Sequence, residues 1–367
     1  MVALGTRPPH DAAEVVRTRV GVLICANVLG GHEFQAAALV RDLARHADVT
    51  VFVNLANQRT LFDTPGVAVH LLEHQLLRKG TLPRQLLDGL RLRGSLRPAI
   101  AGQDQVIISA GAVEAGVAAG VALRGVVPAS LYLPFFYDRI PAWGPVAGRL
   151  YNAVLAACCR LFSRIVTINR IQAKVIRAFT GVATMVVANE VRPVAPPAAR
   201  GPGRLVFVGR LGEQKRVDEL MGWLDFPSNA FDELLLIGDG PLRPALEAQA
   251  KTLKHLRCTF VGWLGPAEQD RLLRSDDVLL INSLLEGEPL SIREAQARGM
   301  RVLARDIVGV RGITRRGTRY RDAAGLRSLL THMAPVRDVP AGSERRQDDG
   351  TRRERQVARL AAAWSRS

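Results

Sequence analysis

Short apolar runs alternate with amphipathic stretches along most of the chain, which is the pattern of buried parallel strands and the helices that cover them. The first run, 20–25, leads through a Gly-Gly loop into a helix predicted from Phe34 to Arg45. In the C-terminal half, the run Val278–Ile281 is followed by a turn at 286–289 and a helix that Gly299 is expected to end. The pattern therefore predicts an α/β protein built from strand–loop–helix units.

The chain also divides into segments of different composition. The stretch 192–203 is rich in Pro, Ala and Gly and predicts a linker without a core. Residues 19–191 and 204–334 are then expected to form two α/β domains, with residues 1–18 as an N-terminal extension. At the C-terminal end, residues 335–355 are polar and rich in helix breakers, which predicts a loose segment, and 356–367 is predicted to be a helix that packs back on the first domain.

Charged side chains follow two predicted strands of the C-terminal half. Glu286 lies on the loop after Val278–Ile281, and Glu294 lies about one turn into the next helix. Arg210 and Lys215 follow the apolar run at 205–208. Because open α/β folds bind ligands at the carboxyl ends of their strands, we expect the two carboxylates to face one pocket.

Three ordered motifs resemble the retaining glycosyltransferases of family 4 of the GT-B fold, the glycosyl transferases group 1. The motifs are LVFVGRL at 205–211 with Lys215, LLLIGDGP at 234–241, and Glu286 with Glu294, Ala295, Ala297 and Gly299. The resemblance is specific from about residue 201 to 312 and looser before that. It implies two Rossmann-like domains, an acceptor-side one and a nucleotide-sugar-binding one, that face each other across a donor-binding cleft.

The resemblance also implies roles for single residues. Arg210 and Lys215 match positions that stabilise the departing diphosphate, and Glu286 matches the carboxylate close to the transferred sugar; these three are the catalytic candidates. Glu294 matches the residue that accepts hydrogen bonds from the ribose hydroxyls. The other donor-binding candidates are Gly30, Gly31, Gly209, Gly240, Trp263, Gly287, Glu288, Pro289, Leu290 and Ser291. His32 is either an acceptor-side contact or an exposed loop histidine.

The activity that the resemblance implies is a hexosyltransferase reaction with retention of configuration. A nucleoside-diphosphate sugar is the co-substrate, and the acceptor is a glycan or a lipid-linked molecule in the biosynthesis of bacterial surface polysaccharide or lipopolysaccharide. No cofactor is expected. No metal is expected either, because an Asp-x-Asp motif is lacking and Arg210 and Lys215 supply positive charge. Many relatives have a histidine where this chain reads SLYLPFF at 130–136, so a catalytically impaired subunit that binds a nucleotide sugar or a partner enzyme is the alternative.

Two other enzyme classes fit the sequence less well. A glycoside hydrolase would use a pair of carboxylates, but that class does not explain Arg210 and Lys215. A dinucleotide-dependent dehydrogenase would show G-x-G-x-x-G after the first strand, and this chain does not.

Composition and charge narrow the partners and the location. The chain has 367 residues, enough for two cores, and a formal net charge of +16, which predicts an anionic partner. Nucleic acid is not expected, since no binding motif is found and aromatic residues make up only 5% of the chain. No apolar run approaches the roughly 20 residues that span a bilayer, and the N-terminus lacks the apolar core of a secretory signal. A cytoplasmic protein is therefore expected. The four cysteines form no metal-binding or disulfide pattern and are expected to be free thiols.

Leucine and arginine alternate in the N-terminal half at 76–79 and 84–93. This pattern is typical of a helix at the surface of an anionic membrane, which would make the protein peripheral on the inner face of the cytoplasmic membrane. The same pattern also fits the solvated face of an ordinary packed helix, and the sequence leaves both interpretations open.

Overall fold

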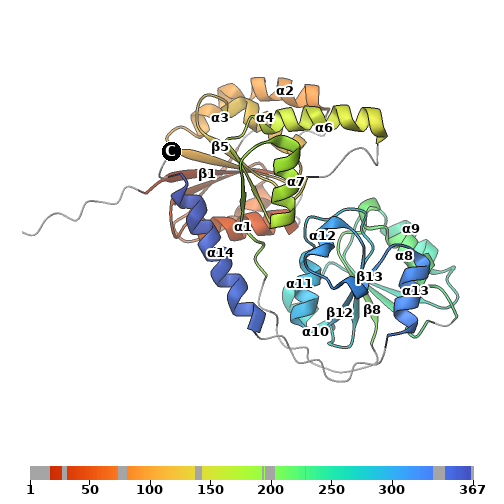
Figure 1. The fold of residues 1–367 in the computed structure, drawn as a ribbon. Helices are drawn as coiled ribbons and strands as arrows, with labels where there is room; N and C mark the ends of the chain where they lie inside the picture. The colour runs from red at the N-terminus through yellow and green to blue at the C-terminus, as the bar shows by residue number, and fades with distance from the viewer. Residues whose placement is uncertain are drawn as a thin grey trace, which may run out of the picture.

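The computed structural model describes residues 17–26, 31–72, 81–136, 143–191, 194, 203–227, 229–333 and 344–364, with side chains of the last segment from 351 onward. These residues form two parallel sheets, each covered by helices on both faces, as Figure 1 shows. The α/β class predicted from the sequence is confirmed. Among the described residues, no helix is long and apolar enough to span a bilayer.

The first sheet has seven strands in the order β3-β2-β1-β4-β5-β6-β7, all parallel. The strands are β1 (Arg19–Cys25), β2 (Asp48–Val53), β3 (Ala68–Leu71), β4 (Gln105–Ala110), β5 (Ala129–Tyr132), β6 (Arg164–Thr167) and β7 (Thr184–Val186). The strand order reverses between β1 and β4, so the loops after these two strands diverge and leave a crevice at the carboxyl edge.

Helices cover the two faces of this sheet unequally. One face carries α2 (Leu82–Arg91), α3 (Arg93–Ala99), α4 (Val113–Leu123), α6 (Pro145–Cys159) and α7 (Arg170–Thr180). The other carries α1 (Gly31–Leu43), the 3-10 helix η1 (Ala56–Phe62) and α14 (Glu344–Ala362). The helix predicted from Phe34 to Arg45 therefore begins three residues earlier, directly after the loop.

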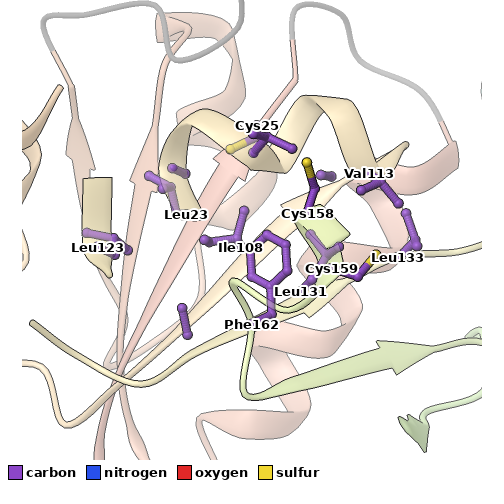
Figure 2. Close-up of a cluster of buried hydrophobic side chains, with 14 of the residues drawn as sticks. Leu23, Cys25, Ile108, Val113, Leu123, Leu131, Leu133, Cys158, Cys159 and Phe162 are labelled. Carbon is purple, nitrogen blue, oxygen red and sulfur yellow. The ribbon is translucent and has the colours of Figure 1, made fainter. Parts of the chain in front are cut away.

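The core under α4 and α6 is apolar and contains sulfur. Figure 2 shows Ile108 and Leu131 from the strands against Cys158, Cys159 and Phe162. All four cysteines are free; three are buried and Cys258 is half-buried, so the chain uses them as small apolar side chains. Burial raises the pKa of the Cys25 thiol to about 12, which keeps it protonated at neutral pH.

The second sheet has six parallel strands in the order β10-β9-β8-β11-β12-β13. They are β8 (Leu205–Val208), β9 (Glu233–Ile237), β10 (Arg257–Gly262), β11 (Val278–Ile281), β12 (Arg301–Arg305) and β13 (Arg319–Tyr320). Its helices are η2 (Glu213–Lys215), α8 (Val217–Leu224), α9 (Arg243–Ala250), α10 (Pro266–Leu272), α11 (Leu290–Ala297), α12 (Val308–Arg311), η3 (Arg316–Thr318) and α13 (Ala323–Thr331). Here the strand order reverses between β8 and β11.

The C-terminal helix α14 returns to the first domain, where it packs beside α1 (Figure 1). Val357, Leu360 and Trp364 are buried in the core of that domain. At the start of this contact, Arg353 Nε donates to Asp42 Oδ2 at 2.7 Å, and the backbone N–H of Ala188 donates to Gln356 Oε1 at 2.9 Å.

The prediction of a loose segment through 355 was wrong, because α14 begins at Glu344. Arg, Glu and Gln dominate this stretch and are good helix formers, so a polar composition does not by itself argue against a helix. The buried side chain of Arg353 also fixes this stretch to the first domain, through its contact with Asp42 on α1. Residues 334–343 lie outside the described part of the chain, as does most of the predicted linker.

The packing of α14 predicts that Leu360→Ala destabilises the first domain by about 2–5 kcal/mol, because it leaves a cavity in a fully buried position. Arg355→Ala, an exposed change on the same helix, should change the unfolding free energy by less than about 0.5 kcal/mol. Urea unfolding of both variants measures the difference. Equal stabilities for the two variants would show that α14 does not pack as described.

Candidate active site

The two crevices at the strand-order reversals face each other across the domain interface. A Cβ added to Gly31, which follows β1, would lie 3.9 Å from Leu290 Cδ1 at the start of α11. A Cβ added to Gly287 would lie 3.2 Å from Ile168 Cδ1, just beyond β6. The carboxyl edges of both sheets therefore border one cleft, at the position where open α/β folds bind ligands.

The structure brings Lys215 and Glu286 together at the carboxyl edge of the second sheet. Lys215 Nζ donates a hydrogen bond to Glu286 Oε1, and the two side chains are 21% and 13% exposed. Two further hydrogen bonds join their loops: Leu284 N donates to Gln214 O at 2.9 Å, and the side-chain Nε2 of Gln214 donates to Leu285 O at 2.5 Å. Because β8 and β11 are neighbours in the sheet, two loops 71 residues apart form one unit.

Arg210 lies beside this pair at the end of β8, and its side chain is exposed. No ion pair of Arg210 is found among the described residues, whereas Lys215 is already paired with a carboxylate. This edge of the sheet thus carries one guanidinium open to solvent and one ammonium held by Glu286. A guanidinium in this position is well suited to bind a phosphate through two parallel hydrogen bonds.

Glycines let the loops after β8 and β9 lie against each other. Gly238 has φ 137°, and a Cβ there would come within 1.9 Å of Gly209 O. A Cβ on Gly240 would come within 2.4 Å of Leu211 O. These contacts explain Gly240, one of the predicted donor-binding residues, through backbone packing. Gly209, at φ 152°, forms the same close contact from the side of β8.

The N-terminus of α11 lies at the same edge. Pro289 is the residue before the first helical turn, and Leu290 and Ser291 begin the helix. Glu294 follows one turn later and is half-buried. The positive end of the helix dipole therefore points toward the cleft, which favours an anion or hydroxyl oxygens there.

Glu288 differs from the sequence prediction. Its Oε2 accepts from Asn169 Nδ2 at 3.2 Å, and its Oε1 accepts from Arg293 Nε at 3.1 Å. Asn169 Nδ2 also lies 3.4 Å from Gly287 O. Asn169 caps helix α7 of the first domain through Gln172 N. Glu288 is thus held between Asn169 of the other domain and Arg293 of its own domain.

A cavity lies next to this contact, between the two domains and α14. Its lining includes Asn169, Glu288, Arg293, Gly309 and Arg352. Glu288 is the only predicted site residue among those that line it. Asn169 was not predicted from the sequence; the available signal was an Asn directly after the apolar run 165–168, where an N-cap is expected.

On the first domain, His32 lies over the ends of β4 and β5. Its Nε2 is 3.0 Å from Ser109 Oγ, and its ring stacks on Tyr132 with centroids 5.2 Å apart. Burial lowers the pKa of His32 to about 4, so the ring is neutral at pH 7. The alternative of an exposed loop histidine is therefore wrong. Its Nδ1 is buried and has no partner within the described residues.

The remaining predicted residues are Trp263, Gly30 and Gly31. Trp263 is exposed on the loop after β10, two strands away from β8. Gly30 lies outside the described residues, whereas Gly31 begins α1. Across the described ranges, no group of three or more His, Cys, Asp or Glu side chains is arranged to hold a metal ion.

The buried imidazole predicts a pH-dependent stability. The pKa of His32 is lowered from 6.5 to about 4 in the folded state, so between these pH values the unfolded chain binds a proton that the folded chain does not bind. Stability should thus be complete above about pH 6.5 and fall progressively toward about pH 4. His32→Gln should reduce this loss, measured by urea unfolding across that range.

Other groups also titrate in that range, so an exposed histidine provides the control. His46→Gln, at the end of α1, should leave the pH profile of the parent unchanged. A His32→Gln profile that coincides with that of His46→Gln would contradict the buried, neutral state of His32.

Residues 202–333 match the family model described as Glycosyl transferases group 1. This segment contains Lys215, Glu286 and Arg210 and spans the second sheet. No curated protein matches the sequence.

Solved structures with similar folds cover nearly the whole chain. HepE from Anabaena, determined in complex with UDP and glucose, has a TM-score of 0.66 at 15% identity over 94% of this chain and 95% of its own. Sucrose-phosphate synthase from Thermosynechococcus elongatus has a TM-score of 0.67 at 15% identity, covering 95% of both chains. A glycosyltransferase from Rickettsia africae has a TM-score of 0.61 at 12% identity, covering 94% of both. The chain therefore has the GT-B fold, and its residues 202–333 are similar to the glycosyl transferases group 1 family.

Proposed function

We propose that the protein transfers a sugar from a nucleoside-diphosphate sugar to a hydroxyl group of an acceptor, with retention of configuration. The observation that carries this proposal is the Lys215–Glu286 pair beside Arg210, at the strand-order reversal of the domain that matches the family model. A sugar nucleotide needs positive charge for its phosphates and a carboxylate for its hydroxyls. This cleft offers both within two adjoining loops.

The diphosphate is proposed to bind between Arg210 and Lys215, in front of the N-terminus of α11. Arg210 is open to solvent and is ready to accept a phosphate, while Lys215 is held in position by Glu286. Fixed donors of this kind stabilise the charge that develops on a leaving group without reorganising during the reaction. The main-chain amides at the start of α11 add a partial positive charge.

The sugar is assigned to Glu286 and the ribose to Glu294, two carboxylates at this edge. Glu286 is next to Lys215 and so lies where the bond between sugar and diphosphate would be. Glu294, one turn into α11, is assigned to the ribose hydroxyls, for which a carboxylate offers two acceptor oxygens. Gly31, opposite Leu290, allows the first domain to approach the bound donor without a side chain in between.

In the proposed reaction, the bond from the anomeric carbon to the diphosphate oxygen breaks while the acceptor oxygen bonds to the same face of that carbon. The acceptor proton passes to the departing diphosphate oxygen, so no separate base is needed. The resemblance of the motifs supports retention. UDP-glucose is the first donor to test, because HepE was determined with UDP-glucose. The acceptor is proposed to be a glycan or a lipid-linked molecule of surface polysaccharide biosynthesis.

One observation favours the second candidate, a subunit that binds a sugar nucleotide without transferring it. The segment at 130–136 contains no histidine, and the ring of Tyr132 in that segment is stacked against His32. Turnover measurements therefore have to accompany binding measurements.

The proposed donor site predicts graded losses in three variants. Arg210→Ala should raise the Kd for UDP by roughly 10- to 100-fold, since it removes charge-assisted hydrogen bonds to phosphate. Lys215→Met should act in the same direction. Glu286→Gln should leave UDP binding within about threefold of the parent but lower turnover of the UDP-sugar by about 10²-fold or more. Calorimetry gives the Kd values, and release of UDP gives turnover.

Matched changes outside the cleft serve as controls. Arg257→Ala and Lys251→Met each remove the same group from an exposed position of the same domain, and Glu247→Gln does so from a partly exposed one. Binding of UDP without turnover in the parent would support the second candidate. Equal effects of Arg210→Ala and Arg257→Ala on UDP, GDP, ADP and dTDP would contradict the donor site. Assays repeated with a chelator show whether Arg210 and Lys215 suffice to stabilise the diphosphate.

Retention gives a separate prediction. With a donor whose anomeric linkage is α, the first product formed should carry an α linkage. Proton NMR of the glycoside product measures the anomeric coupling constant. A β-linked first product would contradict the same-face reaction while leaving the donor site intact.

A further inference from the structure

Helix α6 presents an apolar face to solvent. Of its fifteen residues, Arg149 is the only charged one. The large side chains on its outer side are Val146, 80% exposed, Leu150, 68% exposed, and Val154, 39% exposed, which are spaced four residues apart and so form one stripe. Surface helices of globular proteins normally place charged or polar residues on this side. The stripe is therefore not explained by the packing of the domain.

The stripe is extended by an aromatic side chain. Trp143, just before α6, is about half exposed and packs on Tyr151 with ring centroids 4.3 Å apart. Tyr151 in turn donates to Glu114 Oε1 at 3.3 Å, so this aromatic pair is fixed on the surface. An amphipathic ring held at the end of an apolar stripe is typical of side chains at the boundary between lipid and water.

Helix α2 provides a second apolar surface on the same side of the domain. Leu87 and Leu90 are 57% and 50% exposed, and Leu86 is exposed as well. Both α2 and α6 pack on α4, so both lie on one side of the first sheet, and Figure 1 shows them along the same edge of the molecule. Gly89 allows α2 to approach closely, since a Cβ there would meet Val121 at 2.6 Å.

The charges next to these surfaces are mostly positive. Arg84 and Arg91 are exposed on α2, and Arg149 is exposed on α6. Asp88 is the one acidic residue within α2 and α6. Its Oδ1 lies 3.6 Å from Nη1 of Arg91, which largely neutralises it. Neither Arg84 nor Arg149 forms an ion pair within the residues that the structure describes. The surface thus combines exposed apolar side chains with unpaired cations, on a chain whose net charge is +16.

We infer that the face formed by α2 and α6, with Trp143, docks on an anionic lipid bilayer. Val146, Leu150 and Leu87 enter the boundary between headgroups and acyl chains, while Arg84 and Arg149 contact lipid phosphates. This combination of an apolar stripe and flanking arginines is what an interfacial helix requires. A second copy of this chain would bring the same arginines together, so charge favours lipid. The face lies outside the donor cleft, and binding needs no sugar nucleotide.

Flotation of the full-length protein with vesicles tests the inference. The protein should float with vesicles of phosphatidylcholine and phosphatidylglycerol at low salt, and not with phosphatidylcholine alone. The double variant Val146→Glu/Leu150→Glu should reduce the partition coefficient by at least about tenfold, because carboxylates in the apolar layer are costly. The variant Arg84→Gln/Arg149→Gln should weaken the preference for phosphatidylglycerol.

The matched control places two glutamates on an exposed helix of the second domain, as Ala324→Glu/Ser328→Glu on α13. It should float like the parent, and circular dichroism of each variant checks the fold. A parent protein that does not float at low salt would overturn the inference. So would flotation of Val146→Glu/Leu150→Glu equal to that of the parent. A dimer in light scattering that this variant abolishes, without flotation of the parent, would instead show a self-association face.

Discussion

Parallel strands deliver every following loop to one edge of the sheet, and the residues at this site depend on that constraint. In each domain the strand order reverses once, between β1 and β4 and between β8 and β11. The loops on either side of a reversal diverge, which opens a crevice without any cost in core packing. Because the two sheets face each other, the crevice that holds Lys215 and Glu286 lies opposite the one that holds Gly31 and His32.

Two carboxylates of one loop are directed to different partners. Glu286 is held by Lys215 of its own domain, whereas Glu288 is bonded to Asn169 of the other domain and to Arg293. Gly287, between them, is buried, and a Cβ there would lie 3.0 Å from Phe135 Cδ1. The loop that carries the proposed catalytic carboxylate is therefore also an interdomain contact.

The features predicted from the sequence are those that depend on the local pattern of residues. Lys215, Glu286 and Glu294 could be placed at one sheet edge because each lies in the loop or the first helical turns after an apolar strand. The bonds of Glu288 to Asn169 and of His32 to Ser109 were not predictable, because each joins segments 77 or more residues apart whose approach depends on the whole fold. The start of α14 was missed for a related reason: Arg353 is fixed by Asp42, 311 residues earlier in the chain.

The apolar face of α6 is another feature that could not be predicted from the sequence. Its sequence is that of a buried helix, since apolar residues occur on every side of it, and only the structure shows that the side with Val146, Leu150 and Val154 is exposed. Helix α6 packs on α7, and α7 carries Asn169, which binds Glu288. A bilayer that holds α6 therefore holds the first domain at the helix next to the interdomain contact. In that arrangement the second domain, with the proposed donor site, is joined to the docked domain through the contact of Glu288 with Asn169.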